Sequence, residues 1–267
     1  MAANFCSQVL KKKFKMLSSG IFLLFVGVVS SWNVAMENPK LYGGDMVLSP
    51  EQVAALRNKT LAYGSHKSRR WPNGKIPYVI DRSLGTQARK VIAEAINVYH
   101  RVTCLKFIPR TTERAYINFF FGDGCFSPVG YESSIWLNQK NDVSIGSGCE
   151  SVGTVLHEVG HSIGLYHEQN RPDRDRYVTI VNSNIMKGME YNFQLEYDIN
   201  SLNTPYDLKS IMHYGSKAFA VNRNMRTIVT KDPKLQNLID HYDDVDKFSD
   251  LDIKQINLMY PLCSLGK

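Results

Sequence analysis

Short apolar runs predict strands in the first half of the chain. These runs are residues 76–80, 105–108, 116–121 and 135–137, and polar or turn-forming residues bound them. Pro77 lies in the first run and has no N–H to donate to a neighbouring strand. We therefore expect Pro77 at the start of its strand, or that strand at an edge of the sheet.

Longer amphipathic stretches predict helices. Ser49 caps a predicted helix over 49–56, with Pro50 at its first position. Residues 147–163 and 249–260 predict two further helices, the last with a capping box of Ser249 and Asp252. Strands come mainly early and helices flank or follow them, so the pattern indicates an α+β or α/β fold. Residues 86–99 predict one more helix, whose apolar face holds Ala88, Val91, Ile92, Ala95, Ile96 and Tyr99.

The first 35 residues resemble a secretory signal peptide. A lysine cluster precedes the apolar run 21–29, and small residues that permit cleavage follow between 30 and 35. The run is short for a transmembrane helix of ~20 apolar residues, although an uncleaved signal anchor is the alternative. A start at Met16 would remove the basic region. We expect a secreted, extracellular protein with no stable membrane association after the signal is removed.

Composition and charge narrow the class of protein further. The 267 residues are 43% hydrophobic and 21% charged, which is typical of a globular protein and excludes disorder or coiled coil for the whole chain. The net charge of +7 includes +4 from the leader and −1 from residues 31–57, which leaves 7 − 4 + 1 = +4 for residues 58–267. This modest charge does not indicate a nucleic-acid partner.

Cysteine usage agrees with export. Cys6 lies in the leader, and an even number of cysteines remains, which permits two disulfides in an oxidising compartment. Spacing alone does not choose among the three pairings. A cysteine-based zinc site is not indicated, because none of the pairs has C-x-x-C spacing. The remaining cysteines are Cys104, Cys125, Cys149 and Cys263.

The residues most informative about chemistry are 157–167. His157 and His161 are four apart, so they share one face of a helix and can bind one ion. Gly164 can adopt the left-handed conformation that ends a helix, and His167 then returns from beyond the turn. Three neutral imidazoles and a water suit a catalytic Zn²⁺. Glu158 is offset around the helix and can act as the general base toward that water.

Several separated motifs resemble those of one enzyme family. The eleven residues 157–167 match the metzincin signature of zinc endopeptidases. Glu168 follows it directly, the run 171–178 resembles R-x-D-R-D-x-Y-V, and 210–215 resembles a Met-turn. Together these motifs resemble the astacin family over roughly residues 42–263. The resemblance implies an α+β metzincin-like domain: a twisted mixed sheet with long helices in the N-terminal half, an active-site cleft, and an irregular C-terminal half ending in a helix.

The resemblance also implies roles for individual residues. It assigns one Zn²⁺ to His157, His161 and His167, and the catalytic base to Glu158. The two remaining residues lie in the Met-turn: Met212 would form an apolar floor beneath the metal, and Tyr214 would be a switchable zinc ligand that hydrogen-bonds the oxyanion in the transition state. His213, next to both, is not expected to be a ligand.

The family pattern extends to the cysteines and to the region before the catalytic domain. It pairs Cys104 with Cys263 and Cys125 with Cys149. Residues 42–45, Tyr-Gly-Gly-Asp, resemble the family's F-x-G-D latency motif, so Asp45 would displace the catalytic water. A substrate backbone would add as a strand near residues 126–130, where Pro128 would remove one donor.

Maturation is predicted to divide the chain into a signal peptide (1–35), a propeptide (36–57) and a protease domain (58–267). The new N-terminus of such a domain would reach Glu168. Cleavage after Arg57 is favoured, with Arg70–Trp71 and a site near 61–62 as alternatives. Asn58 begins the only N-x-[ST] sequon, so it would be either a buried, unglycosylated N-terminus or a glycosylated residue lost with the propeptide.

The sequence therefore predicts a secreted, monomeric zinc endopeptidase made as a latent proenzyme, which acts on protein or peptide substrates. A catalytically silent binding protein and a zinc hydrolase of small molecules are the alternatives. Because only four residues follow Cys263, an adhesive module is not expected. The region 238–248 offers His241 and Lys247 but no arginine, so a preference for acidic substrates does not follow.

Overall fold

The computed structural model describes residues 34–58, 69–131, 140–197, 200–240 and 245–261. All of them belong to the unit Ser31–Lys267. Most of the predicted signal peptide, the predicted strand at 135–137, and both His241 and Cys263 lie outside the described residues. The predictions on those residues are therefore untested.

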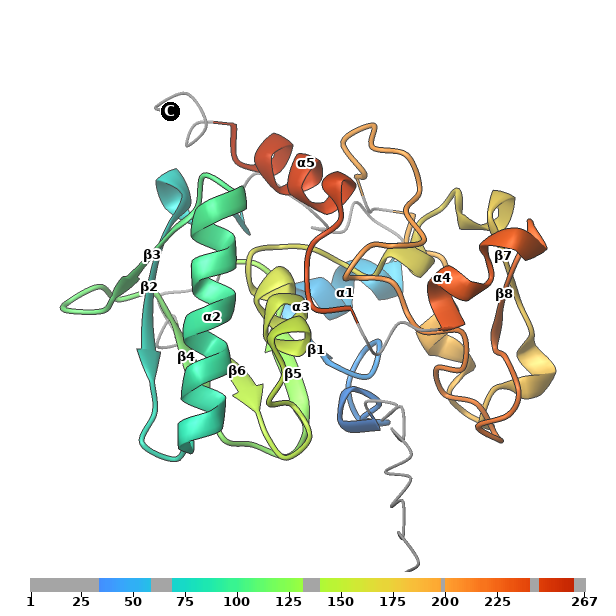
Figure 1. Ribbon diagram of the computed structural model, residues 1–267, viewed down its shortest axis with the longest axis horizontal. Coiled ribbons are helices and arrows are strands. Elements are labelled where there is room, and N and C mark those ends of the chain that lie inside the picture. The colour runs from blue at the N-terminus through green and yellow to red at the C-terminus, as the bar shows by residue number, and fades with distance from the viewer. Residues whose placement is uncertain (1–33, 59–68, 132–139, 198–199, 241–244, 262–267) are drawn as a thin grey trace, which may run out of the picture. The chain divides into compact units, whose positions relative to one another are not determined.

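A six-stranded mixed sheet forms the first half of this unit (Figure 1). Neighbouring strands pair in parallel, except for β5 and β6, which are antiparallel. From one edge to the other the strands are β1 (Met46–Val47), β5 (Cys125–Pro128), β6 (Lys140–Ile145), β4 (Tyr116–Phe120), β2 (Lys75–Ile80) and β3 (Lys106–Pro109).

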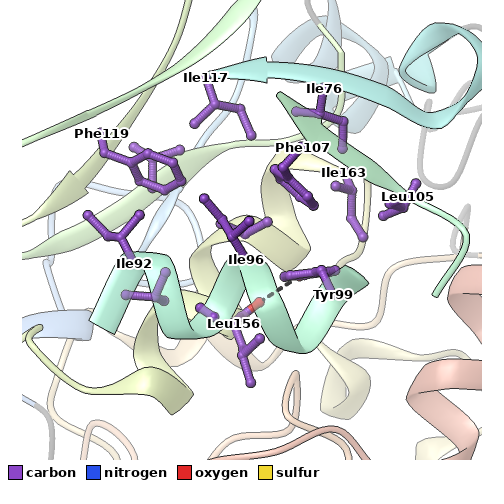
Figure 2. Close-up of a cluster of buried hydrophobic side chains, with 14 of the residues drawn as sticks. Ile76, Ile92, Ile96, Tyr99, Leu105, Phe107, Ile117, Phe119, Leu156 and Ile163 are labelled. Carbon is purple, nitrogen blue, oxygen red and sulfur yellow. Dashed lines mark hydrogen bonds between the residues drawn. The ribbon is translucent and has the colours of Figure 1, made fainter. Parts of the chain in front are cut away.

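Two helices, α2 (Thr86–Val102) and α3 (Val152–Ser162), pack against each other and against the sheet. Figure 2 shows Ile92 and Ile96 of α2 facing Ile117 and Phe119 of the sheet. The predicted apolar face of α2 is buried at all six positions. Tyr99 also ties the two helices together, since its hydroxyl donates a hydrogen bond to the Leu156 carbonyl, 2.9 Å away.

The second half is largely irregular. A two-stranded antiparallel sheet of β7 (Val178–Ile180) and β8 (Ile228–Thr230) and the short α4 (Asn237–Asp240) lie in it, and α5 (Asp250–Met259) follows. Between β1 and β2 along the chain, α1 spans Pro50–Asn58. Short 3₁₀ helices occupy Val34–Met36, Pro72–Gly74, Glu168–Asn170, Arg174–Arg176, Asn182–Asn184, Glu190–Phe193 and Pro233–Leu235.

Two of the differences between the predictions and the structure have a local cause. α3 begins at Val152 rather than 147, because Cys149 forms a disulfide with Cys125 and Ser151 caps the helix. Pro77 lies inside β2, between two neighbouring strands, and not at an edge. The proline is tolerated there because β4 pairs with β2 only from Tyr78 onward, which leaves Pro77 a paired neighbour on the β3 side alone.

The predicted disulfide between Cys125 and Cys149 is confirmed, with Cα atoms 5.7 Å apart. Cys104 is also disulfide-bonded, but its predicted partner Cys263 lies outside the described residues, so that pairing stays a prediction. Among the helices of the described ranges, none combines the length and the apolar character needed to cross a membrane.

Candidate metal centre

Two histidines of α3 point their Nε2 atoms toward one position. His157 Nδ1 donates a hydrogen bond to the Ile211 carbonyl at 2.6 Å, and His161 Nδ1 donates to the Leu165 carbonyl at 2.8 Å. Because a carbonyl oxygen can only accept, the proton of each ring lies on Nδ1. Each Nε2 therefore carries a lone pair directed into the site.

The chain turns after α3 and returns with the third histidine. Gly164 has φ +110, a conformation that favours glycine, so it ends the helix as expected. His167 is fully buried, and its Nε2 lies 3.3 Å from that of His157. Burial lowers the pKa of His161 and lowers that of His167 to about 4, so both imidazoles are neutral at pH 7, as metal ligands must be.

The carboxylate of Asp45 lies among the three imidazoles. Its oxygens are 3.2 Å from Nε2 of His157, 3.4 Å from Nε2 of His161 and 3.2 Å from Nε2 of His167. One ligand atom from each of the four residues lies within 4.8 Å of the others, and all four side chains are buried. Asp45 therefore lies where the latency prediction places it.

This group fits a zinc ion chemically. A carboxylate and lone-pair nitrogens are all acceptors, and buried acceptors that face each other require a cation or protons between them. His161 Nε2 and Asp45 Oδ1 have no hydrogen-bond partner in the described residues. Nitrogen and oxygen ligands in a group of four are the set that Zn²⁺ prefers.

Glu158 lies beside this group without joining it. Its side chain is fully buried, and neither carboxylate oxygen has a hydrogen-bond partner among the described residues. Burial, and then the charge of Asp45, raise its pKa well above the usual value for a glutamate. A buried carboxylate with free oxygens can accept a proton from a group placed next to it.

Met212 packs against α3, the helix that carries His157 and His161. It is 2% exposed, and a Cβ added at Gly160 would lie 2.7 Å from the methionine sulfur. Gly160 is the residue before His161 on α3, so the absence of a side chain there lets Met212 approach the histidine helix closely. The role of Met212 as an apolar floor beneath the metal stays a prediction.

Tyr214 packs on the metal group, but its hydroxyl is bound elsewhere. Its ring centroid lies 4.6 Å from that of His167, and its hydroxyl donates a hydrogen bond to the Gly43 carbonyl. A Cβ at Gly43, which has φ +60, would lie 2.8 Å from Nδ1 of His167. The segment 43–45 therefore occupies the space next to both His167 and Tyr214.

The predicted propeptide makes further contacts with the rest of the unit. The β1 pairing places Met46 opposite Ser127 of β5, whose N–H donates to the Asp45 carbonyl at 2.8 Å. In α1, Gln52 is 3% exposed, and its amide donates to the Val129 carbonyl and the Tyr166 hydroxyl. We did not predict a role for Gln52, because a polar residue in an amphipathic helix gives no local signal of burial.

Glu168 is buried in a polar network. One of its oxygens accepts hydrogen bonds from Arg171 at 2.9 Å and from the Asp207 N–H at 2.8 Å. Burial raises the pKa of Glu168 to about 7, against the lowering effect of Arg171. Asn58, the predicted first residue of the mature chain, is here the last residue of α1. The predicted contact between the mature N-terminus and Glu168 stays a prediction.

His213 is not part of the metal group. Its Nδ1 donates to the Tyr214 carbonyl at 2.6 Å, and its Nε2 accepts from the Tyr206 hydroxyl at 2.8 Å. The backbone carbonyls of Ile211 and Leu165, which orient two of the rings, could not be identified from sequence. Every residue carries a carbonyl, so only the fold selects these two.

A helix with an H-E-x-x-H pattern, a third histidine beyond a glycine turn and a methionine packed against that helix define a zinc peptidase of the metzincin class. The family model described as Astacin, a peptidase family, matches residues 64–261. The chain therefore belongs to the astacin family of zinc metalloendopeptidases. This result confirms the enzyme class, the zinc cofactor and the α+β metzincin-like fold that the sequence predicted.

Individual relatives support the assignment. Zinc metalloproteinase nas-4 of Caenorhabditis elegans is 38% identical over 224 residues, which cover 81% of this chain and 68% of that protein. Meprin A subunit beta of Rattus norvegicus is 42% identical over 197 residues, or 73% of this chain and 27% of that protein. The chain thus spans only about a quarter of the meprin subunit.

A solved structure has a similar fold. High choriolytic enzyme 1, a hatching enzyme zinc-protease from Oryzias latipes, superposes with a TM-score of 0.65 at 35% identity. The match covers 73% of this chain and 96% of that chain. Nearly the whole of that protease chain therefore has a counterpart here.

Proposed function

We propose that this protein is a secreted endopeptidase made as a latent proenzyme. Residues 1–35 would be its signal peptide, 36–57 its propeptide and 58–267 its protease domain. The match to the family model begins at residue 64, which agrees with a domain that starts shortly before it. The single observation that carries the proposal is the convergence of Asp45 on His157, His161 and His167.

Asp45 belongs to the propeptide in this proposal, and the three histidines belong to the protease domain. With Zn²⁺ held by the three histidines, the buried carboxylate of Asp45 would be a further ligand and would exclude water and substrate from the metal. One residue would therefore block the metal, and removal of the propeptide would open the site. A monomer is sufficient, because all four residues come from one chain.

The residues of the protease domain then have distinct roles. When bound, Zn²⁺ supplies a Lewis acid that polarises the scissile carbonyl and acidifies the attacking water. Glu158 takes the proton of that water and passes it to the leaving nitrogen, for which its two buried carboxylate oxygens, without a hydrogen-bond partner among the described residues, are available. Tyr214, freed from Gly43, would donate its hydroxyl hydrogen to the developing oxyanion.

The substrate backbone is proposed to bind along β5. In the described structure β1 pairs with β5, with Val47 opposite Pro128. Loss of the propeptide would leave β5 as the edge strand, which is a ready template for an extended peptide. Because Pro128 has no N–H, the substrate would receive one backbone hydrogen bond fewer at that position.

Hydrolysis of casein by the activated protein tests the proposal. Activity should disappear in a zinc chelator and return when zinc is restored. The proform with an intact propeptide should be silent in the same assay. A zinc-loaded, activated protein that cleaves neither casein nor a peptide library would favour the alternative of a silent binding protein.

A further inference from the structure

The C-terminal helix contacts the loop that orients a zinc ligand. Asp252, in the first turn of α5, is 2% exposed. Its Oδ1 accepts a hydrogen bond from the Ser210 hydroxyl at 2.6 Å, and its Oδ2 accepts from the Ile211 N–H at 2.9 Å. Both donors lie about forty positions earlier in the chain, at the start of the Met-turn.

The same loop residue holds the first histidine. The Ile211 carbonyl accepts the hydrogen bond from His157 Nδ1 at 2.6 Å. Asp252 therefore binds the N–H of the residue whose C=O orients the ring. Ser210 adds a second connection, since its oxygen accepts from the Met212 N–H at 3.1 Å while its hydroxyl donates to Asp252.

Helix capping alone does not explain this arrangement. In the capping box, Asp252 needs only its bond from the Ser249 N–H, at 3.0 Å. The other two bonds go to the Met-turn. Capping carboxylates are ordinarily exposed, and burial of a carboxylate is costly unless its oxygens are hydrogen-bonded. All three donors to Asp252 are neutral, so the contact fixes geometry without forming an ion pair.

We propose that Asp252 is a positioning residue of the zinc site, which fixes the Ile211 carbonyl and through it the ring of His157. This inference rests on the proposed function insofar as His157 is taken as a zinc ligand. Partners that orient a ligand imidazole commonly change metal affinity by about 10–100-fold when they are lost. Because Asp252 acts through Ile211, we expect an effect near the lower end of that range.

The test measures zinc release from the full chain. Transfer of zinc to an excess of a chromogenic chelator gives the dissociation rate, and thermal unfolding of the zinc-free chain gives the stability of the fold. Asp252→Ala should release zinc about tenfold faster. Asp252→Asn should be close to wild type, because its amide oxygen can accept from both N–H groups while its NH₂ donates to the Ser210 oxygen.

Two controls separate positioning from stability. Ser249→Ala removes the cap of α5, a 2.9 Å bond from the Asp252 N–H, and also the hydrogen bond from the Ser249 hydroxyl to Asp207, but it leaves the bonds from Asp252 to the Met-turn. It should lower the Tm of the zinc-free chain and leave zinc release near the wild-type rate. Asp250→Ala removes an exposed carboxylate of the same helical turn. It should change neither the Tm of the zinc-free chain nor the rate of zinc release.

Three results would overturn the inference. One is wild-type zinc release from Asp252→Ala. Another is release from Ser249→Ala as fast as from Asp252→Ala, which would assign the effect to the bonds of Ser249 and not to those between Asp252 and the Met-turn. If Asp252→Ala does not fold, Ser210→Ala takes its place, and a wild-type rate there would be the third. A wild-type chain that binds no zinc would instead contradict the proposed function itself.

Discussion

The hydroxyl of Tyr214 and the carbonyl of Gly43 form a hydrogen bond that joins the two proposed parts of the proenzyme. Gly43 lies two residues before Asp45, so one short segment contacts both the metal group and the proposed oxyanion donor. In the latent proenzyme this segment would block both the metal group and Tyr214. Tyr214 would be free to act only after this bond is broken.

Tyr214→Phe tests whether the Tyr214 hydroxyl acts in the transition state or in substrate binding. The activated variant should fold, bind zinc and turn over about 10²–10³-fold more slowly, because one oxyanion donor contributes about that much in the transition state. The loss should fall on kcat, measured by initial rates over a range of peptide concentrations. An effect confined to KM would instead assign Tyr214 to substrate binding.

Asp45→Ala should weaken latency. The substitution removes the fourth buried ligand but leaves the β1 pairing and the α1 contacts in place, so the propeptide remains attached. The variant proform should therefore show peptidase activity before any cleavage. An electrophoretic check that the propeptide is intact serves as the control. A variant proform as silent as the wild type would mean that the bulk of the propeptide blocks the site.

Local sequence patterns predicted the elements with strong periodicity. The buried face of α2 and the capping box of α5 were predicted correctly, because residues a few positions apart encode them. β6 was missed, since its buried positions include polar residues. Asn141, for example, is fully buried and donates hydrogen bonds to the Gly130 carbonyl and to Ser162. Hydrophobic alternation cannot reveal a strand whose inward groups are satisfied in this way.

The candidate site also has a part that the local sequence predicted and a part that it did not. The spacing of His157, His161 and His167 predicted a shared ion, because helix geometry and one glycine turn determine it. Asp45 was predicted only through a family resemblance, since 112 positions separate it from His157. The bonds from Asp252 to the Met-turn depend on how α5 packs, and no local pattern encodes that contact. Long-range polar contacts were therefore the part that sequence could not supply.

Glu158→Gln tests the general base. The amide is nearly the same size and keeps the buried position, but it cannot take a proton from water. Zinc content should stay at one ion per chain, and peptide hydrolysis after activation should fall by several orders of magnitude. Metal analysis and a fluorogenic peptide assay on the same preparation provide both measurements. Near-normal turnover in a zinc-loaded variant would refute the base role.

We expect the stability of the fold to depend on pH through Asp240, which lies outside the metal group. Burial raises its pKa, but hydrogen bonds from Arg226, Ser216 and Gln236 outweigh burial and lower the pKa from 3.8 to about 2. A carboxylate with a lowered folded-state pKa stabilises the fold above its unfolded pKa, and this contribution is lost as pH falls through the folded pKa. Asp240→Asn should be less stable than wild type at pH 5.

The difference in stability between wild type and Asp240→Asn should shrink as pH falls from about 4 to 2, because wild-type Asp240 becomes protonated. Urea midpoints measured on zinc-free protein give the comparison without acid-induced loss of zinc. Protonation of the buried histidines is common to wild type and Asp240→Asn, so it cancels in the difference between them. A difference that stays constant across this range would show that the carboxylate charge does not stabilise the fold.

The last prediction concerns the N-terminus of the active enzyme. Cleavage after Arg70 is disfavoured by packing, because Trp71 is 2% exposed and its indole N–H donates to the Ser162 carbonyl at 2.9 Å. The chain is already part of the catalytic unit two residues earlier, where the Arg69 carbonyl accepts from the Tyr131 N–H at 2.7 Å. A chain that began at Trp71 would have little length left to reach Glu168.

Cleavage after Arg57 would leave residues 58–68 ahead of the packed Arg69, and we expect this additional length of chain to be enough for the contact with Glu168. Arg57→Ala should therefore prevent maturation at this site, whereas Arg70→Ala should mature normally, as N-terminal sequencing would show. Asn58 would then be the first residue, and its amine is expected beside the buried Glu168. A glycan on Asn58 could not fit there, because a sugar chain requires solvent. Intact mass of the active enzyme settles the point: an active chain that begins at Asn58 and carries a glycan on it would contradict the prediction.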